Sequence, residues 1–137
     1  MSHVSSIRLK IKDITALQLA VQKIGMQFHP EKKLYKAFLN GHGSCTHAIS
    51  AINAPNADEI GVVKLDDETY ELRVDSYQNR NVALEQIAGR DCSKLMEAYT
   101  QVVAIKEATK VAEAEGYIIN IEEDATTGET VITLRSH

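Results

Sequence analysis

The stretch "VSSIRLKIKDITALQLAVQKIG", residues 4–25, decides the fold, because a strand pattern runs directly into a helix pattern. Within residues 4–12, apolar and basic side chains alternate, which predicts a strand, since successive side chains of a strand point to opposite faces. The apolar positions are Ile7, Leu9 and Ile11, and the basic ones are Arg8, Lys10 and Lys12. Asp13 can then cap a helix that Gly25 ends, with apolar residues at helical spacing between them. The stretch therefore predicts a β–α unit.

The rest of the chain carries the patterns of short strands, two helices and two hairpins. The expected strands cover residues 26–40 (one or two short strands), 44–52, 60–65, 69–75, 117–124 and 130–136, and the expected helices cover residues 82–88 and 91–115. In the long helix, apolar residues from Leu95 to Ala112 recur at spacings of three and four, which indicates a face that packs on the sheet. The predicted fold class is α+β: a single domain, residues 1–137, with an antiparallel sheet and two main helices packed on one face.

Size and composition favour a soluble chain with one packed core. The chain has 137 residues, of which 44% are apolar, and a domain of this size can bury roughly two-thirds of its unfolded surface. It has no apolar run of roughly 18 residues, so no membrane span is expected. The first residues lack the apolar block of a secretion signal, and two cysteines without framework spacing favour reduced thiols. We expect a cytoplasmic protein that does not act at membranes.

Charge is distributed unevenly along the sequence. Residues 1–40 contain seven basic and two acidic residues, whereas residues 41–137 contain eight and 17, for a net charge of −4. The basic stripe of Arg8, Lys10 and Lys12 could hold an anion or an acidic partner, or it could be a solvated strand face or an edge protected by lysine. An acidic total argues against non-specific binding of nucleic acid, which depends on a basic surface.

The stretch "NGHGSCTHAISA", residues 40–51, concentrates the residue types that carry chemistry. His42, Cys45 and His47 offer the ligand types of zinc, but a structural zinc site needs four ligands, and the spacing is not a paired cysteine or histidine pattern. Cys45 could act as a nucleophile only with a nearby base, for which His47 is the candidate. Ser44 lacks the Gly-x-Ser-x-Gly context of a nucleophile elbow. We therefore expect no metal and no catalytic residue here.

Two further interpretations of residues 40–51 concern the glycines. Backbone N–H groups and hydroxyls of the stretch could cradle a phosphate, although it lacks the Lys-Ser/Thr ending of a P-loop and does not lead into a helix. Alternatively, the glycines form a turn, and small residues on a strand let another element pack close, with Cys45 as a small buried group. We favour the second. If an anion binds, the candidate residues are Arg8, Lys10, Lys12, Gly41, His42, Gly43, Ser44 and His47.

Three blocks of the sequence resemble a known protein family. The matching positions are Met1-Ser2-His3 with Ile7, Ile11, Leu17 and Gly25, then "TYELRVD" (residues 69–75), then Tyr99, Gly116-Tyr117 and residues 128–134. In these positions the chain resembles a conserved family of hypothetical proteins of cyanobacteria, algal plastid genomes, some other bacteria and phages, known as the plastid reading frame "thirty-five", of unknown function. The resemblance implies a fold and a soluble location, and it brings no catalytic residues.

The sequence lacks a complete acid/base pair, a nucleophile set and a metal spacing, so we predict a non-enzymatic protein without a cofactor. The acidic clusters at residues 66–68 and 122–124 lie in expected hairpin turns, where carboxylates are usually solvated. The leading hypothesis is a binding or adaptor protein that acts on an unknown protein partner, with a homo-oligomer possible. The alternative is a protein that binds or sequesters a small anionic, nucleotide-like ligand at residues 41–47, as a phage-encoded protein could do.

Overall fold

The computed structural model describes residues 4–36, 42–52, 58–66, 68–75, 82–123, 126 and 129–136. The chain divides into two compact units, Met1–Val102 (unit 1) and Val103–His137 (unit 2). In order, the elements are β1 (Val4–Ile11), α1 (Ile14–Lys23), β2 (Met26–His29), β3 (Leu34–Lys36), β4 (His42–Ser44), β5 (His47–Ala51), β6 (Ile60–Lys64), β7 (Tyr70–Asp75), α2 (Val82–Ala88), the 3-10 helix η2 (Arg90–Cys92), α3 (Ser93–Ala114), β8 (Tyr117–Glu123) and β9 (Thr130–Ser136). The α+β class is confirmed, with antiparallel strand pairing throughout.

The β–α unit at residues 4–25 forms as its pattern predicts. The carboxylate of Asp13 accepts a hydrogen bond of 2.9 Å from the Ala16 amide, which satisfies one of the free N–H groups at the start of α1. Four residues of α1 are buried, namely Ala16, Leu17, Ala20 and Val21. Gly25 ends the turn after α1 at a φ of 78°, a conformation that favours glycine.

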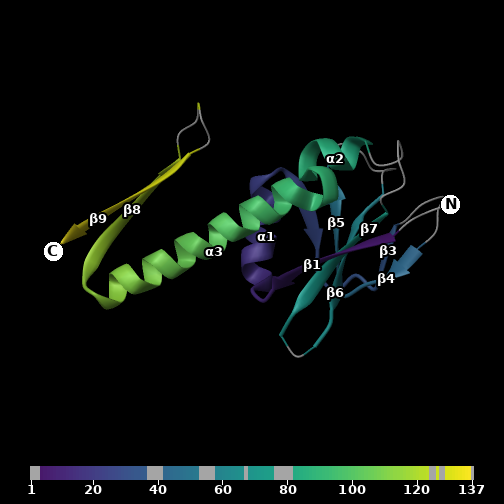
Figure 1. Ribbon diagram of the computed structural model, residues 1–137, viewed down its shortest axis with the longest axis horizontal. Helices are drawn as coiled ribbons and strands as arrows, with labels where there is room; N and C mark the ends of the chain where they lie inside the picture. The colour runs from purple at the N-terminus through teal and green to yellow at the C-terminus, as the bar shows by residue number, and fades with distance from the viewer. Residues whose placement is uncertain are drawn as a thin grey trace. The chain divides into compact units, whose positions relative to one another are not determined.

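The main sheet of unit 1 has five strands in the order β1-β7-β6-β5-β2 (Figure 1). Every neighbouring pair is antiparallel, so β1 and β2, at the two edges, run in the same direction. α1 connects these two edge strands, while β5, β6 and β7 follow one another as neighbours between them. The first two strands of the main sheet, β1 and β2, therefore form its two edges, and β5, β6 and β7, which come later in the chain, lie between them.

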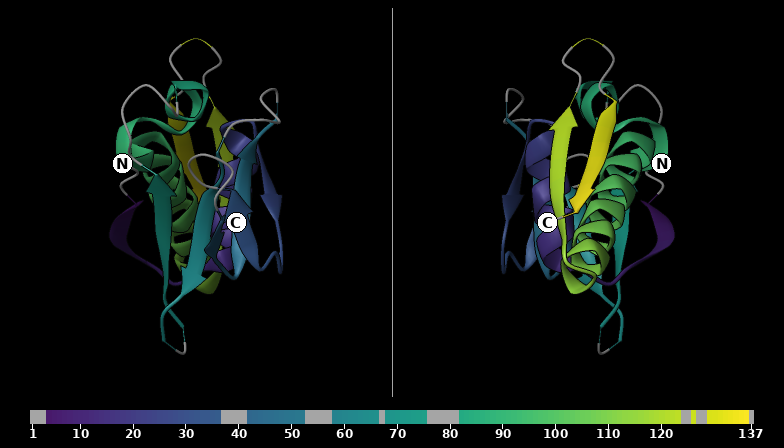
Figure 2. Two further views of the ribbon diagram at one scale, coloured as in Figure 1. Left: turned by 90° about the vertical axis from the view of Figure 1, so that its right-hand side faces the viewer. Right: turned by 90° about the vertical axis from the view of Figure 1, so that its left-hand side faces the viewer.

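One face of this sheet holds the apolar core. Opposite residues of paired strands share a face, and the register puts Ile49, Ile60, Val62 and Leu72 on the same one, each 0% exposed. α1 and the unit 1 part of α3 cover this face (Figure 2). The Tyr99 hydroxyl on α3 accepts hydrogen bonds from the backbone amides of Lys12 (3.1 Å) and Asp13 (3.2 Å), and so binds α3 to the β1–α1 junction.

The expectation of one continuous strand over residues 44–52 is wrong. β4 ends at Ser44 and β5 begins at His47, because the chain changes its pairing partner between them. The Cys45 amide still donates to the Lys33 carbonyl (2.9 Å), next to β3, whereas the Thr46 amide donates to the Val62 carbonyl (2.8 Å) on β6. The break is the point at which the chain leaves the small β3–β4 sheet and enters the main sheet.

The β3–β4 hairpin packs on the main sheet through Tyr35, which is 2% exposed. Tyr35 pairs with Gly43 across the hairpin, and its ring also lies over Gly61 on β6. A Cβ atom built on either glycine would collide with this ring. Neither glycine has a positive φ, so the small side chain is needed for space and not for backbone conformation.

Unit 2 contains the end of α3 and the β8–β9 hairpin. The strands pair over seven residues, from Tyr117↔Ser136 to Glu123↔Thr130, as the "TTG" pattern predicts, but they form a two-stranded sheet of their own. Within the described residues of unit 2, Ala112 is the only one that is buried. The apolar residues of α3 that were expected to pack on the sheet differ along the helix. Leu95 and Ala98, in unit 1, are buried, whereas Ile105, in unit 2, is partly exposed.

Candidate functional site

The polar side of the main sheet is organised around Glu59, just before β6. Both carboxylate oxygens of Glu59 accept hydrogen bonds from the Lys32 ammonium group, at 2.9 and 2.7 Å. The same carboxylate accepts from the Lys36 amide at 2.7 Å, and the Glu59 amide donates back to the Lys36 carbonyl at 2.9 Å. With 8% of its surface exposed, Glu59 is a buried carboxylate that fixes the segment leading into and through β3.

Glu59 is ionised at neutral pH. Burial alone would raise the pKa of its carboxyl, because a charge is poorly solvated there. The hydrogen bonds from Lys32 and the Lys36 amide, together with the charges of Lys32 and His29, outweigh burial and hold the pKa below its ordinary value. The cluster is therefore a satisfied ion pair, in which the Lys32 charge is already neutralised.

Cys45 lies beside this cluster as a protonated thiol. Its Sγ donates a hydrogen bond of 3.0 Å to the Lys32 carbonyl. Burial first, and then the negative charge of Glu59, raise the pKa of the Cys45 thiol, and the nearby Lys32 offsets this only in part. A thiol with a raised pKa is a poor nucleophile at neutral pH, so the position suits a packing role better than covalent catalysis.

His47 is held in a different environment, on the helix-covered face. Its Nδ1 accepts a hydrogen bond of 3.0 Å from the Glu31 amide, and its ring packs between Phe28 (centroids 5.2 Å apart) and Tyr70 (5.9 Å). Burial lowers the pKa of the His47 imidazole, and the nearby Glu31 carboxylate counteracts this only in part. His47 is therefore a neutral ring that closes the end of the apolar face, and the Cys45 thiol donates to a backbone carbonyl instead of to it.

The candidate residues of the anion cradle come together only in part. The Tyr35 ring fills the space beside Gly43, and Ser44 is exposed at the end of β4. Gly41 and the side chain of His42 lie outside the described residues. No group of three or more His, Cys, Asp or Glu side chains in the described part of the chain could hold a metal ion. What the structure shows at residues 43–47 is close packing around Tyr35, with hydrogen bonds to the preceding β3 segment.

The basic stripe and His47 lie on different strands of the main sheet. Arg8 and Lys10 belong to β1, and their side chains lie outside the described part, while Lys12 is exposed just beyond the strand. β7 and β6 separate β1 from β5 in the sheet, which corresponds to roughly 14 Å at the usual strand spacing. His47 is thus on a strand with two others between it and β1, whereas Gly43 and Ser44 lie on β4, in the separate β3–β4 sheet.

The β8–β9 hairpin presents a surface of another kind. Its register puts Tyr117, Ile119, Ile121, Ile132 and Leu134 on one side, here called the apolar face. Four of these are among the exposed large hydrophobic residues: Tyr117 (38%), Ile121 (40%), Ile132 (39%) and Leu134 (53%). The other side, the mixed face, carries Ile118, Asn120, Glu122, Val131, Thr133 and Arg135. The hairpin therefore has one side that is almost free of charge and still open to solvent.

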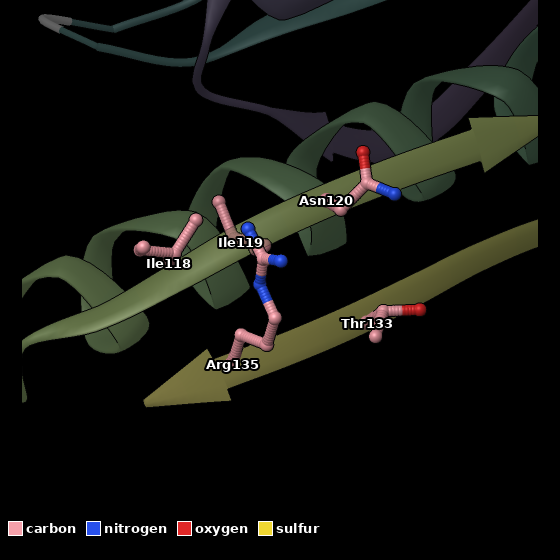
Figure 3. A pocket seen from close by; sticks show the side chains of 5 residues that line it. All are labelled: Ile118, Ile119, Asn120, Thr133 and Arg135. Carbon is pink, nitrogen blue, oxygen red and sulfur yellow. The ribbon is translucent and has the colours of Figure 1, made fainter. Parts of the chain in front are cut away.

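A pocket of about 480 Å³ lies against the hairpin. Figure 3 shows its lining residues Ile118, Ile119, Asn120, Thr133 and Arg135, with the Arg135 side chain extending from β9 over β8. Arg135 is the only charged group in this lining. Since the lining strands are almost wholly exposed, the pocket is a hollow of the hairpin surface and not an enclosed cavity.

Three features of these sites were not predicted from the sequence. Glu59 follows the turn "NAPNAD" with no local pattern to mark it as buried, and Tyr35 lies in an expected strand without any sign of its glycine partners. The exposure of the hairpin had no signal either, because alternate apolar residues on one side of both strands predict a face that packs on a core.

The fold and these sites define an α+β protein in which one unit has a complete core and the other leaves an apolar face open. A scan of protein-family models and searches of curated proteins and of solved structures found no match to the chain. In the described residues, no helix has the length and apolar character needed to cross a membrane.

Proposed function

We propose that the chain is a non-enzymatic binding or adaptor protein whose apolar face on the β8–β9 hairpin docks onto a protein partner. The observation that carries this proposal is that unit 2 exposes far more of its large apolar side chains than it buries. Ala112 alone is buried among its described residues, whereas six large apolar side chains of the hairpin are exposed, namely Tyr117, Ile118, Ile121, Val131, Ile132 and Leu134.

A unit of this size needs outside help to be stable. Folded units below about 40 residues usually depend on disulfides, metals or association with another chain. Both cysteines of the chain, Cys45 and Cys92, precede unit 2, so no disulfide can form within it. Apolar side chains that remain open on a small unit are typical of a surface that is buried on association.

The chemistry of the apolar face suits a protein ligand. It combines four aliphatic side chains with Tyr117, and aromatic residues that present a ring and a hydroxyl are enriched at the centres of interfaces. The face is flat, because it consists of two paired strands, and uncharged except at its turn end, where Glu123 lies. A partner with an apolar strand or helix face would match it.

The alternative, capture of a small anionic ligand at residues 41–47, has less support. An anion needs free positive charge or free N–H groups, yet Lys32 is paired with Glu59 and Gly43 is covered by the Tyr35 ring. Enzymatic use of Cys45 has less support for a related reason, since its thiol is protonated and bound to a carbonyl.

The test compares two double variants of the hairpin. Ile121→Ser with Leu134→Ser alters the apolar face, and Ile118→Ser with Val131→Ser alters the mixed face at positions of similar exposure (40% and 53% against 40% and 50%). Each tagged protein is used to capture proteins from lysate of the source cells, and bound proteins are quantified by mass spectrometry. A partner retained by the wild type and the mixed-face variant, but lost with the apolar-face variant, is the expected result.

Equal retention by all three proteins would overturn the proposal. Comparison of native and denatured masses of the untagged protein tests the alternative on the same preparation. Extra mass on the native protein alone would identify a bound small ligand and favour residues 41–47, and an unchanged mass is expected if the chain acts through protein contacts.

A further inference from the structure

We propose that the turn between β2 and β3 is a pH-sensitive switch, closed while the ring of His47 is neutral and opened when that ring is protonated. The inference goes beyond the proposed function, because it concerns unit 1 and not the β8–β9 hairpin. It rests on a hydrogen bond to the ring, an unusual backbone conformation at Glu31 and the contacts that the neighbouring Lys32 makes.

The closed turn depends on a neutral ring at position 47. The Glu31 amide donates a hydrogen bond of 3.0 Å to His47 Nδ1. A ring nitrogen can accept a hydrogen bond only in the neutral form, because both nitrogens of an imidazolium carry protons and act as donors. Protonation of His47 must therefore break this bond, since two N–H groups would then face each other.

The backbone of Glu31 favours opening once the bond is lost. Its φ is 59°, in the left-handed region that residues with a Cβ atom rarely adopt without local support. The hydrogen bond from its own amide to His47 provides such support. When the bond breaks, the turn loses this restraint and Glu31 can return to an ordinary backbone conformation.

Glu31 also provides a contact for the open state. Its side chain is exposed, and its negative charge favours protonation of His47 by raising the pKa of the imidazole. In the protonated ring, the Nδ1–H group can donate to the Glu31 carboxylate, which replaces the bond from the Glu31 amide. One residue thus offers a donor to the neutral ring and an acceptor to the charged ring, so the turn has two alternative arrangements.

The ring of His47 lies among groups from three other strands. It packs against Phe28 of β2 and Tyr70 of β7, and Val62 of β6 lies opposite it in the register. Burial lowers the pKa of the imidazole below its ordinary value, and the Glu31 carboxylate offsets this only in part. The turn is therefore closed at neutral pH and opens in acid, below about pH 6.5.

Charged and titratable groups from each neighbouring element lie toward this end of the sheet face. They are Glu31 in the turn, Tyr70 on β7, Lys64 on β6, and Lys12 and Asp13 at the β1–α1 junction. Lys64 is exposed and lies opposite Tyr70, and the β1–α1 junction follows Ile11, which also pairs with Tyr70. Among these groups, Glu31 is the one whose charge acts on the pKa of His47.

Opening of the turn would reach the β3–β4 hairpin. Lys32, next to Glu31, pairs with Glu59, and its carbonyl accepts a hydrogen bond of 3.0 Å from the Cys45 thiol. The Lys33 carbonyl accepts another, of 2.9 Å, from the Cys45 amide. A turn that moves at Glu31 displaces the atoms that make these contacts, whereas β5 keeps its backbone pairing with β6.

Nuclear magnetic resonance of the isotope-labelled full chain tests the proposal between about pH 7.5 and pH 5. The signals of the His47 ring and of the Glu31 amide should titrate with the same midpoint. The protection factors of the Glu31 and Cys45 amides against hydrogen exchange should fall at least about tenfold as the ring is protonated. The Thr46 amide is the internal control, since it donates to Val62 in the main sheet and should keep its protection.

Three variants separate the proton on the ring from other effects of acid. His47→Gln keeps a hydrogen-bond acceptor that does not titrate, so the protection factors should stay constant over this pH range. Glu31→Gln removes a charge that favours protonation, so the midpoint should move to lower pH. His29→Gln removes the neighbouring histidine, which contacts Ser50 on the other face of the sheet, and should leave the response unchanged.

A Glu31 amide that does not follow the titration of His47 would overturn the proposal, as would an equal loss of protection in His47→Gln and the wild type. An equal loss at Thr46 would overturn it too, because the whole sheet would then loosen in acid. If His47→Gln does not fold, the comparison of the Glu31 and Thr46 amides in the wild type still decides. Capture of a partner by the β8–β9 hairpin is independent of these results.

Discussion

The ammonium group of Lys32 lies 2.7 Å from a carboxylate oxygen of Glu59, and this contact joins the segment before β3 to the segment before β6. The Glu59 carboxylate also accepts a hydrogen bond from the Lys36 amide, so one buried carboxylate binds two separate donor groups, and the Glu59 amide donates to the Lys36 carbonyl. The small hairpin depends on this carboxylate on one side and on Tyr35 on the other.

Replacing Glu59 with Gln should destabilise unit 1 by about 1–3 kcal/mol at neutral pH, because the charge-assisted bonds to Lys32 are lost. Urea unfolding followed by circular dichroism measures this. Lys32→Gln should cost at least as much, since it leaves the buried Glu59 carboxylate without the charge that offsets its burial, whereas the half-exposed Lys32 can be solvated once Glu59 is neutral. A much smaller cost for Lys32→Gln would contradict the dependence of the buried carboxylate on Lys32.

The same pair predicts a pH dependence of stability. The pKa of folded Glu59 lies below its unfolded value, so the unfolded chain binds the proton more tightly, and the contribution of Glu59 is fully present above the unfolded pKa. It is lost as the pH falls through the folded pKa. Unfolding free energies between about pH 7 and pH 3 should therefore fall less steeply in Glu59→Gln than in the wild type. Parallel curves would show that Glu59 does not titrate in this way.

Gly61→Ala should destabilise the chain by about 1–3 kcal/mol, because the added methyl group meets the ring of Tyr35. In a Tyr35→Val background, where the ring is absent, the same change should cost less than half as much. A thermal or urea double-mutant cycle measures the difference. If Gly61→Ala lowered the free energy of unfolding equally in both backgrounds, the close approach of the Tyr35 ring would not be the reason that residue 61 is glycine.

Tyr99→Phe should cost about 1–2 kcal/mol of stability, because the amides of Lys12 and Asp13 lose their acceptor at the β1–α1 junction. Tyr117→Phe is the matched control, since Tyr117 is exposed on the hairpin, and it should change stability by less than about 0.5 kcal/mol. Hydrogen exchange should show faster exchange of the Lys12 and Asp13 amides in the first variant only.

Cys45 should react slowly with thiol reagents at neutral pH. In a Cys92→Ala background, its rate in the folded protein should be at least about tenfold below that in denaturant, and should rise only at a pH above the ordinary thiol pKa. Adding Glu59→Gln removes a charge that raises this pKa, so the rate profile should move to lower pH. A profile at or below the ordinary thiol range would mean that Cys45 is activated.

Local patterns were sufficient for most of the secondary structure. The alternation in β1, the Asp13 cap and the glycines after α1 and α3 each act through neighbours within a few residues, so the sequence shows them directly. The hairpins were predictable for the same reason.

Features that depend on distant partners were not predictable. The strand break at Cys45 and Thr46 results from a change of hydrogen-bond partner from Lys33 to Val62, which no local pattern reveals. The candidate site was affected most, since the role of Gly43 is set by the Tyr35 ring, eight residues earlier and in another strand. The hairpin pattern of β8 and β9 likewise does not say whether the strands join the main sheet.

The position of β1 at the edge of the sheet has a consequence for biosynthesis. Val4 pairs with Asp75, so β1 leaves the ribosome before β7, its neighbour in the described sheet, has been made. At usual translation rates, the strand waits roughly four to fourteen seconds without a partner. An unpaired apolar strand invites aggregation, and Arg8, Lys10 and Lys12 are spaced to act as gatekeepers that keep the nascent segment dissolved until β7 arrives.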